Sequence, residues 1–366
     1  MTATALESSS LPLEPRGEEP LWERVERLLA RTDDLDALRA HRLHLLAAHR
    51  RRRMGLPVAP ELDAELLRSA WIALLTPLVL AAARRAYGGR IVLLKGLEVS
   101  ACYPEPSTRP FMDADLLVDD AAAAQRALLA AGFREVGDPA RYVRIHHGRP
   151  LVHPELPVPV ELHQTPKWLP WARAPRASEL LDRAVPGQAG VDGVLALPAA
   201  EHAVVLAVHS WAHEPLRRAL ELVDVAAVAS GADPAETEAL AEAWGVGRVW
   251  RTTTRAVEGL LEGSRLPPPV GLWARGLVEV RERTVLESHL ERWLGRFSER
   301  PFPRALGEVP GALLADLRRH AGDSWSRKAR RSAIAVQHAL LPRSHHDRII
   351  ETRDVGPTRV GERSGR

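Results

Sequence analysis

The 366-residue chain contains a single cysteine, Cys102, and few aromatic residues, which make up 5% of the sequence. One thiol excludes an intrachain disulfide framework and a zinc site built from several cysteines, and it agrees with a reducing compartment. The formal net charge is only +3 with histidine neutral, so charge gives no reason to expect a nucleic-acid partner. We therefore expect a cytoplasmic protein that does not act on nucleic acid.

No segment has the pattern of a secretory signal or of a membrane span. The first 20 residues lack a basic stretch followed by an apolar one, and they carry four glutamates. The longest apolar run, Trp71–Ala83, is interrupted by Pro77 and followed by two arginines. A bilayer span needs about 20 apolar residues, so this run predicts a buried helix in a soluble protein with no membrane partner.

Hydrophobic residues make up 45% of the chain and charged residues 27%, which is typical of globular proteins, and the length allows two core-forming units. The pattern predicts an α+β fold, with a small mixed β-sheet core flanked by helices and then a mainly helical domain. The expected divisions are a disordered leader (1–19), N-terminal helices (20–89), the sheet domain (90–187), the helical domain (188–300), a basic C-terminal helical segment (301–348) and a disordered tail (349–366).

Proline and glycine mark the expected element boundaries. Glu61–Tyr87 predicts a long helix that Pro77 kinks or divides. Lys167–Pro186, rich in Trp and Pro, predicts a linker or lid, and Val270–Arg296 predicts one of a series of helices beginning at Pro198. The expected strands are 90–95, 112–118, 133–136, 142–146, 151–153, 158–163 and 193–197, with short helices at 97–103 and 119–131.

Two aspartates alternate with apolar residues in the expected strand 112–118. In a strand, residues i and i+2 project from the same face, so Asp113 and Asp115 point together. Two like charges side by side repel unless a cation or a shared proton relieves them. This pair, close to the Lys95-Gly96 turn, is a candidate site for metal and phosphate.

A third acid lies downstream in the sequence VELH. A strand there sets Glu161 and His163 on one face, and if it lies beside 112–118, Glu161 converges with Asp113 and Asp115. Three carboxylates suit Mg²⁺, and two-metal sites use such groups to hold the attacking and leaving oxygens of a phosphoryl transfer. His163 could bind a phosphate, orient Glu161 or serve as a structural partner.

The segments LLKG, PFMDADLLV and VELH, followed by HSWAH and LVD, resemble the bacterial family of uncharacterised nucleotidyltransferases, within the polymerase-β-like superfamily. The resemblance extends from about Leu66 to Glu262. It implies an enzyme that uses Mg²⁺ (or Mn²⁺) and an NTP, moves the NMP group to a hydroxyl or similar acceptor on a small molecule, peptide or protein, and releases pyrophosphate.

The resemblance also implies roles for individual residues. Asp113, Asp115 and Glu161 would be the catalytic and metal-binding acids. The triphosphate would be positioned by Lys95, by the amide of Gly96 and by Arg109, whose guanidinium can grip a pair of phosphate oxygens. The cleft or acceptor side would include His163, His209, His213 and Asp224.

Two other functions compete with this interpretation. The Lys-Gly turn departs from the superfamily's usual Gly-Ser or Gly-Gly, which favours a non-catalytic nucleotide- or peptide-binding adaptor of the same fold. His209 and His213 are four residues apart on an expected helix, a spacing that can bind zinc, with Asp224 as a third ligand. A zinc hydrolase is the weaker of the two, because no acidic residue lies between the histidines.

Overall fold

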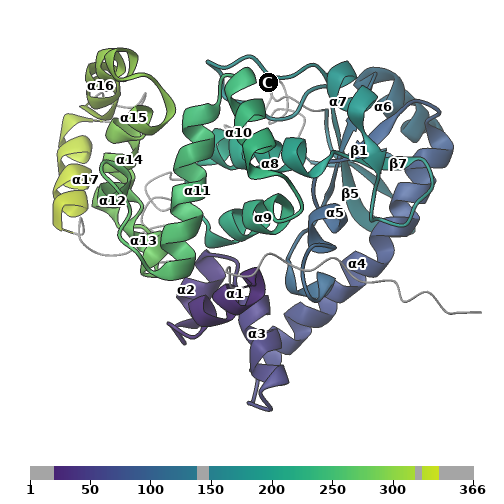
Figure 1. Ribbon diagram of the computed structural model, residues 1–366, viewed down its shortest axis with the longest axis horizontal. Coiled ribbons are helices and arrows are strands. Elements are labelled where there is room, and N and C mark those ends of the chain that lie inside the picture. Colours follow the sequence, from purple (N-terminus) through teal and green to yellow (C-terminus); the bar gives the residue numbers. More distant parts are fainter. Residues whose placement is uncertain (1–19, 138–147, 318–323, 338–366) are drawn as a thin grey trace, which may run out of the picture.

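The computed structural model describes residues 20–137, 148–317 and 324–337 (Figure 1). The predicted leader, the predicted tail and the expected strand at 142–146 lie outside these ranges. Within them, the chain forms one seven-stranded mixed sheet together with many helices. This arrangement confirms the predicted α+β class.

The sheet is built from short strands whose partners are distant in the sequence. The strands are β1 (Ile91–Leu93), β2 (Ala114–Val118), β3 (Arg134–Glu135), β4 (Leu151–His153), β5 (Leu156–His163), β6 (Val185–Pro186) and β7 (Val194–Ala196). Their order is β3-β4-β5-β2-β1-β7-β6. β2 is antiparallel to β1 and parallel to β5, and β7 is parallel to β1. β7 therefore extends the sheet into the range predicted for the helical domain.

Helices cover both faces of this sheet (Figure 1). The N-terminal helices are α1 (Leu21–Leu29), α2 (Leu35–Ala40), α3 (His44–Arg53) and α4 (Pro60–Ala86), and the short elements after β1 are α5 (Leu97–Ser100) and the 3₁₀ turn η1 (Pro106–Thr108). Then follow α6 (Ala121–Ala130), α7 (Ala177–Arg183), α8 (Ala199–His213), α9 (Ala219–Ala229), α10 (Pro234–Ala243) and α11 (Gly247–Glu262). α7 and β6 lie in the segment predicted to be a linker or lid, so that prediction missed two elements.

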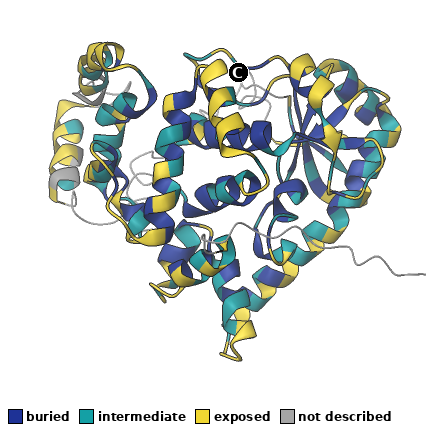
Figure 2. Cartoon of the chain, in the orientation of Figure 1, coloured by how far each residue is buried: buried dark blue, intermediate teal, exposed yellow. Residues whose placement is uncertain are grey.

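The strands of the sheet and the helices packed on them are largely buried (Figure 2), and the alternating side chains of β2 belong to two separate core clusters. Leu116 and Val118 belong to a cluster with Val79 and Leu80 of α4 and with residues of α6. Leu117 faces the opposite way, into a larger cluster that includes much of α8, α9 and α11. Since Asp115 alternates with Leu116 along the strand, it shares the face of Leu117 and points toward the helical layer.

The C-terminal helices are shorter than the sequence predicts. The expected helix Val270–Arg296 is divided into α12 (Val270–Trp273), α13 (Arg275–Val278), α14 (Val285–Leu294) and the start of α15 (Arg296–Glu299). Val280 has φ of 46°, outside the helical region, and Thr284 begins α14 as its N-cap, with its hydroxyl accepting from the Glu287 amide. The chain continues with α16 (Phe302–Leu317) and α17 (Trp325–Gln337).

α4 is continuous through Pro77 and differs in burial from the prediction. Trp71, Leu74 and Leu78 are 56%, 68% and 54% exposed, so the predicted buried helix is wrong for this face. By length and composition, α4 is the one helix of the described residues that could cross a membrane. Only 33% of its most apolar 18-residue stretch is buried. Core helices of soluble proteins also have this length and composition, so these two properties alone are weak evidence for a membrane span.

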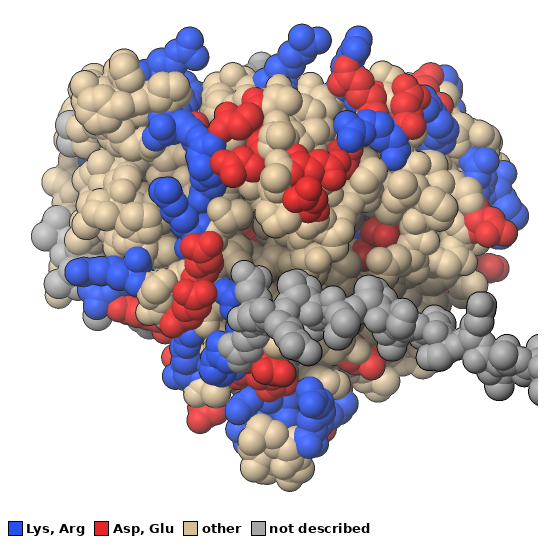
Figure 3. Space-filling view, viewed as in Figure 1, with Lys and Arg blue, Asp and Glu red and all other residues tan. Residues whose placement is uncertain are grey.

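Charged side chains of both signs are interspersed over the surface seen in Figure 3. Four arginines, Arg50–Arg53, end α3. Arg50 and Arg53 contact Glu26, and Arg52 contacts Asp63. The arginine run is therefore a helix end paired with nearby acids, and not an open anion-binding patch.

Candidate active site

The register between β2 and β5 places two acids side by side. Asp115 is the direct partner of Glu161 across this parallel pair, and Leu117 is the partner of His163. Register partners project from the same face of a sheet. The three polar side chains therefore lie together on the face that the helical layer covers.

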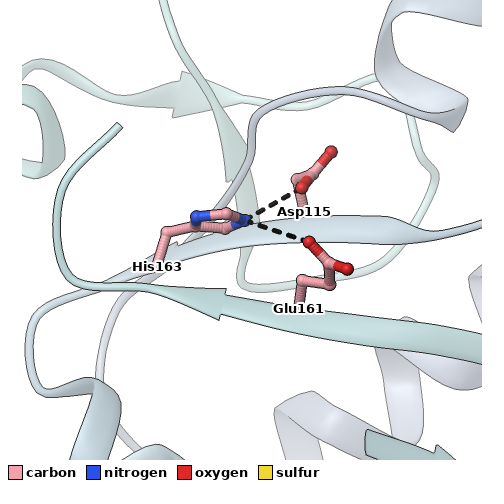
Figure 4. A group of neighbouring side chains, drawn as sticks. All are labelled: Asp115, Glu161 and His163. Carbon is pink, nitrogen blue, oxygen red and sulfur yellow. Dashed lines mark hydrogen bonds and ion pairs between the residues drawn. The ribbon is translucent and has the colours of Figure 1, made fainter. Parts of the chain in front are cut away.

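His163 joins the two acids into a compact group (Figure 4). Its Nε2 lies 2.9 Å from Oδ1 of Asp115 and 3.9 Å from Oε2 of Glu161. One ligand atom from each of the three residues lies within 4.8 Å of the others. Two carboxylates and an imidazole are a donor set that suits a divalent cation, so the residues present fit the metal that the sequence implies.

Asp113 lies just before β2, and its carboxylate is repelled by the like charge of Asp115. Burial and the charge of Asp115 raise the pKa of Asp113, although Lys95 and Arg42 oppose the shift. Burial also disfavours the Asp115 carboxylate, but the hydrogen bond with His163 and the charge of Lys95 outweigh it and lower its pKa. One acid is therefore held ionised while its neighbour resists ionisation, as expected when no cation neutralises the pair.

Lys95 and Gly96 form a tight turn against these acids. The Leu94 amide donates to the Asp115 carbonyl at 2.9 Å, which extends the β1–β2 ladder up to the turn. Gly96 has φ of 63°, and a Cβ there would lie 3.0 Å from the Asp113 carbonyl oxygen. Only glycine allows this backbone conformation together with this close approach. The requirement for glycine thus fixes Lys95 next to the carboxylates.

Residues from both layers line a recess over the acid group. Its walls are formed by Leu94, Lys95, Asp115, His163, Pro166, Lys167, Val205 and His209. The recess has a volume of only about 10 Å³ for water-sized groups, so it is a narrow opening over the acid group and does not enclose a nucleotide. Lys167 was not singled out from the sequence, since nothing in its linker-like surroundings marks it.

Residues 32–262, more than half of the chain, match the family described as uncharacterised nucleotidyltransferase. The chain belongs to this family. Comparisons with curated proteins and with solved structures found no match. The match supports the predicted class of enzyme, and the register of β2 and β5 gives this nucleotidyltransferase two adjacent carboxylates in its sheet.

Arg109 of the nucleotidyltransferase does not face the recess in the predicted way. Its Nε and Nη2 donate to the two carboxylate oxygens of Asp224 at 2.7 and 2.8 Å, and its Nη1 donates to the Gly96 carbonyl at 3.3 Å. Tyr103 donates a further bond to Asp224 at 2.6 Å. Both members of the ion pair are buried, so Arg109 locks the loop before β2 onto α9 and has no free edge for a phosphate.

The two histidines of α8 lie in different surroundings. Burial and the charge of Lys95 lower the pKa of His209 well below its ordinary value, so the imidazole that lines the recess is neutral. His213 lies beside Lys167, whose Nζ is 2.6 Å from its Nδ1. A neighbouring ammonium opposes a bound cation, and Asp224 is already taken by Arg109. The zinc alternative therefore lacks its third ligand in this nucleotidyltransferase.

Glu221 on α9 is a further acid near the site that the sequence did not reveal. Burial raises its pKa, against a 2.6 Å hydrogen bond from Ser210 and the charges of Arg218 and Lys95. The charges of Asp115 on the sheet and Glu221 on α9 both oppose the lowering of the Lys95 pKa by burial. Glu221 immediately precedes the Leu-Val-Asp segment that ends at Asp224. It is not part of that motif, so no sequence pattern marked it.

Proposed function

We propose that the chain transfers a nucleoside monophosphate from an NTP to a hydroxyl or similar acceptor, with Mg²⁺ or Mn²⁺ bound by the acids of β2 and β5. The observation that carries the proposal is the pairing of Asp115 with Glu161 across two parallel strands, with His163 hydrogen-bonded to Asp115. Family membership gives the reaction class, and this geometry supports the acids of β2 and β5 as its site.

Asp115 and Glu161 would hold the metal, with Asp113 as a further ligand at the start of β2. The raised pKa of Asp113 indicates an excess of negative charge that a divalent cation would neutralise. His163 orients Asp115 through its 2.9 Å hydrogen bond, as partners of metal ligands commonly do. When bound, the metal would withdraw charge from the phosphate oxygens and align them for displacement.

Two lysines supply the positive charge that Arg109 does not. Lys95 and Lys167 line the same recess as Asp115, and burial lowers the pKa of both ammonium groups. Negative phosphate oxygens between them would favour the charged form of each lysine. In phosphoryl transfer, most of the rate enhancement comes from positioning and from such charge stabilisation.

The acceptor's proton would pass to His209. The acceptor oxygen attacks the α-phosphorus, the new O–P bond forms as the bond to the bridging oxygen of the β-phosphate breaks, and pyrophosphate leaves with that electron pair. A base must remove the hydroxyl proton. The neutral imidazole of His209 lines the recess across from Asp115, whereas Glu161 is committed to the metal group.

The helical layer would select the acceptor, which we propose to be a small molecule, a peptide or a protein side chain. α8 and α9 bring His209 and Glu221 to the site from the side opposite the sheet. The rival proposal is an adaptor that binds the nucleotide or a peptide and does not turn it over. The Lys95-Gly96 turn is the feature that favours this rival.

Incubation with α-labelled ATP, GTP, CTP or UTP and Mg²⁺ tests the proposal. We expect label on the protein, on a co-purified acceptor or on a supplied hydroxyl compound, with release of unlabelled pyrophosphate. Asp115→Asn should abolish labelling, while Asp120→Asn, which alters an exposed acid that caps α6, should retain it. Mg²⁺-dependent NTP binding without pyrophosphate release over a broad acceptor panel would replace the enzyme with the adaptor.

A further inference from the structure

The outer face of α4 carries a row of exposed apolar side chains. Leu67, Trp71, Leu74 and Leu78 are 61%, 56%, 68% and 54% exposed, and they follow one another at intervals of four, three and four residues. The opposite side of α4 is buried against the sheet through Val79 and Leu80. We call the four exposed residues the α4 seam. α4 therefore has two apolar faces, and the molecule itself covers only one.

The spacing of the α4 seam is that of the a and d positions of a coiled coil. Monomeric proteins rarely expose contiguous apolar patches of more than a few hundred Å² without a function. The row continues toward both ends of α4 through the small residues Ala64 and Ala81. Small residues at the ends and large ones in the centre allow a second helix to approach closely along the whole length.

We propose that the α4 seam is the interface with a second copy of this chain, paired antiparallel about a two-fold axis between residues 72 and 73. In that register, Leu67 lies opposite Leu78 of the second copy, and Trp71 lies opposite its Leu74. Ala64 lies opposite Ala81 about the same centre. A two-fold interface must be self-complementary, and every apolar position of the seam finds an apolar partner under this single operation.

The charges at the ends of the seam select the antiparallel register. Glu61 and Arg85 are exposed residues of the first and last turns of α4, and the two-fold axis brings the end of α4 that carries Glu61 beside the end that carries Arg85 in the second copy. In the described part of the chain, neither residue has an ion-pair partner of its own. A parallel pairing would instead place like charges together at both ends, which is unfavourable.

The pairing leaves the proposed active site open. The seam points away from the sheet, whereas Asp115 and Glu161 lie on the opposite face, under α8 and α9. Figure 1 shows α4 along the edge of the molecule, on the far side of the sheet from α8. The inference is therefore independent of the proposed function.

Sedimentation velocity of the full-length chain at micromolar concentrations tests the interface. We expect a dimer, and we expect Leu74→Glu to raise the dimer dissociation constant about 100-fold or more, because it buries two like charges near the axis. Leu272→Glu, which alters a 54% exposed leucine on α12, is the matched control and should leave the dimer intact. A monomeric wild-type chain, or a dimer unaffected by Leu74→Glu, would overturn the proposal.

Charge exchange tests the register without altering an apolar residue. Glu61→Arg and Arg85→Glu should each weaken the dimer about tenfold, and the double variant should restore it. Weakening that the double variant does not reverse would reject the antiparallel pairing. Flotation of the wild type with anionic vesicles, together with a monomer in their absence, would instead assign the α4 seam to a lipid surface and overturn the dimer.

Discussion

Asp115 and Glu161 face each other as register partners on β2 and β5, two parallel strands that lie at the centre of the sheet. A one-residue shift in this register would send Glu161 to the opposite face of the sheet. The proposed metal site therefore depends on the hydrophobic alternation of two strands, since that alternation fixes the register.

Replacing Asp113 should separate activity from stability. Asp113→Asn removes a proposed metal ligand, so the rate of nucleotidyl transfer should fall about 10³-fold or more. The folded protein raises the pKa of this acid, so its charge is unfavourable at neutral pH, and Tm should stay the same or rise. Transfer assays and thermal melts of the same samples measure both, with Asp120→Asn as control. A large fall in Tm would mean that the carboxylate is structural.

Removing divalent metal should stop the reaction reversibly. We expect EDTA to abolish transfer of α-label and added Mg²⁺ or Mn²⁺ to restore it, because the acid group needs a cation to accept phosphates. Mn²⁺ binding followed by electron paramagnetic resonance gives a readout that does not depend on turnover. Asp115→Asn should weaken that binding, whereas His213→Gln should not. Restoration by Zn²⁺ alone would contradict the proposed chemistry.

His209 should control the rate and not nucleotide affinity. His209→Gln removes the proposed base, so kcat should fall about 10²-fold or more, while the Kd for NTP changes little. Single-turnover kinetics and equilibrium binding separate the two effects. Asp120→Asn, which alters the exposed N-cap of α6 away from the recess, is the control. If Glu161 accepted the proton instead, His209→Gln would retain most of the wild-type rate.

The ion pair between Arg109 and Asp224 should contribute to stability. Asp224→Asn leaves the buried Arg109 without its counter-charge and should lower the free energy of unfolding by about 3–5 kcal/mol. Arg109→Met should also destabilise, and the double variant Arg109→Met/Asp224→Leu should recover much of the loss. Urea unfolding measures all three. A role for Arg109 in phosphate binding would instead appear as a higher Kd for NTP in Arg109→Met than in Asp224→Asn.

His202 should make the protein less stable in mild acid. Its Nε2 lies 2.7 Å from the buried Leu94 carbonyl, and burial lowers its pKa to about 4. The imidazole of His202 binds a proton near pH 6.5 in the unfolded chain but only near pH 4 in the folded chain. Its contribution to the free energy of unfolding is therefore fully present above pH 6.5. That contribution, up to about 3 kcal/mol, is lost as the pH falls from 6.5 to 4.

A matched variant isolates this contribution. His202→Gln cannot titrate in this range, and its amide can still donate to the Leu94 carbonyl. We therefore expect urea unfolding of His202→Gln between pH 7 and pH 4.5 to show a smaller loss of stability than the wild type. Equal losses would assign the acid sensitivity to other buried histidines, such as His41.

Local features of the sequence predicted much of the sheet and part of the site. Apolar runs bounded by Gly and Pro predicted β1, β2, β5 and β7, and the Asp-x-Asp spacing placed Asp115 on one face of β2. The predicted approach of Glu161 depended on VELH lying beside this strand, and the register shows that it does. The roles of the individual acids stay predictions, since geometry alone does not assign them.

The sequence could not indicate which polar residues would already have partners. Arg109 has the chemistry of a phosphate ligand, but its Nε and Nη2 donate to Asp224, from a helix far along the chain, and its Nη1 donates to the Gly96 carbonyl. Lys167 and Glu221 reach the recess from segments with no distinctive pattern. The same limit applies to α4, where composition predicted burial and the fold leaves Trp71 and Leu74 exposed.

The sequence by itself determined the periodicities of this protein: which residues alternate in strands, which recur in helices and where the chain must turn. These follow from backbone geometry and nearest neighbours. Only the tertiary structure decided which charges meet, because the strength of an ion pair or the shift of a pKa depends on distance and burial between distant segments. For this reason the hydrogen bond between Asp115 and His163, and the ion pair that holds Arg109 on Asp224 and not in the recess, appear only in the folded structure.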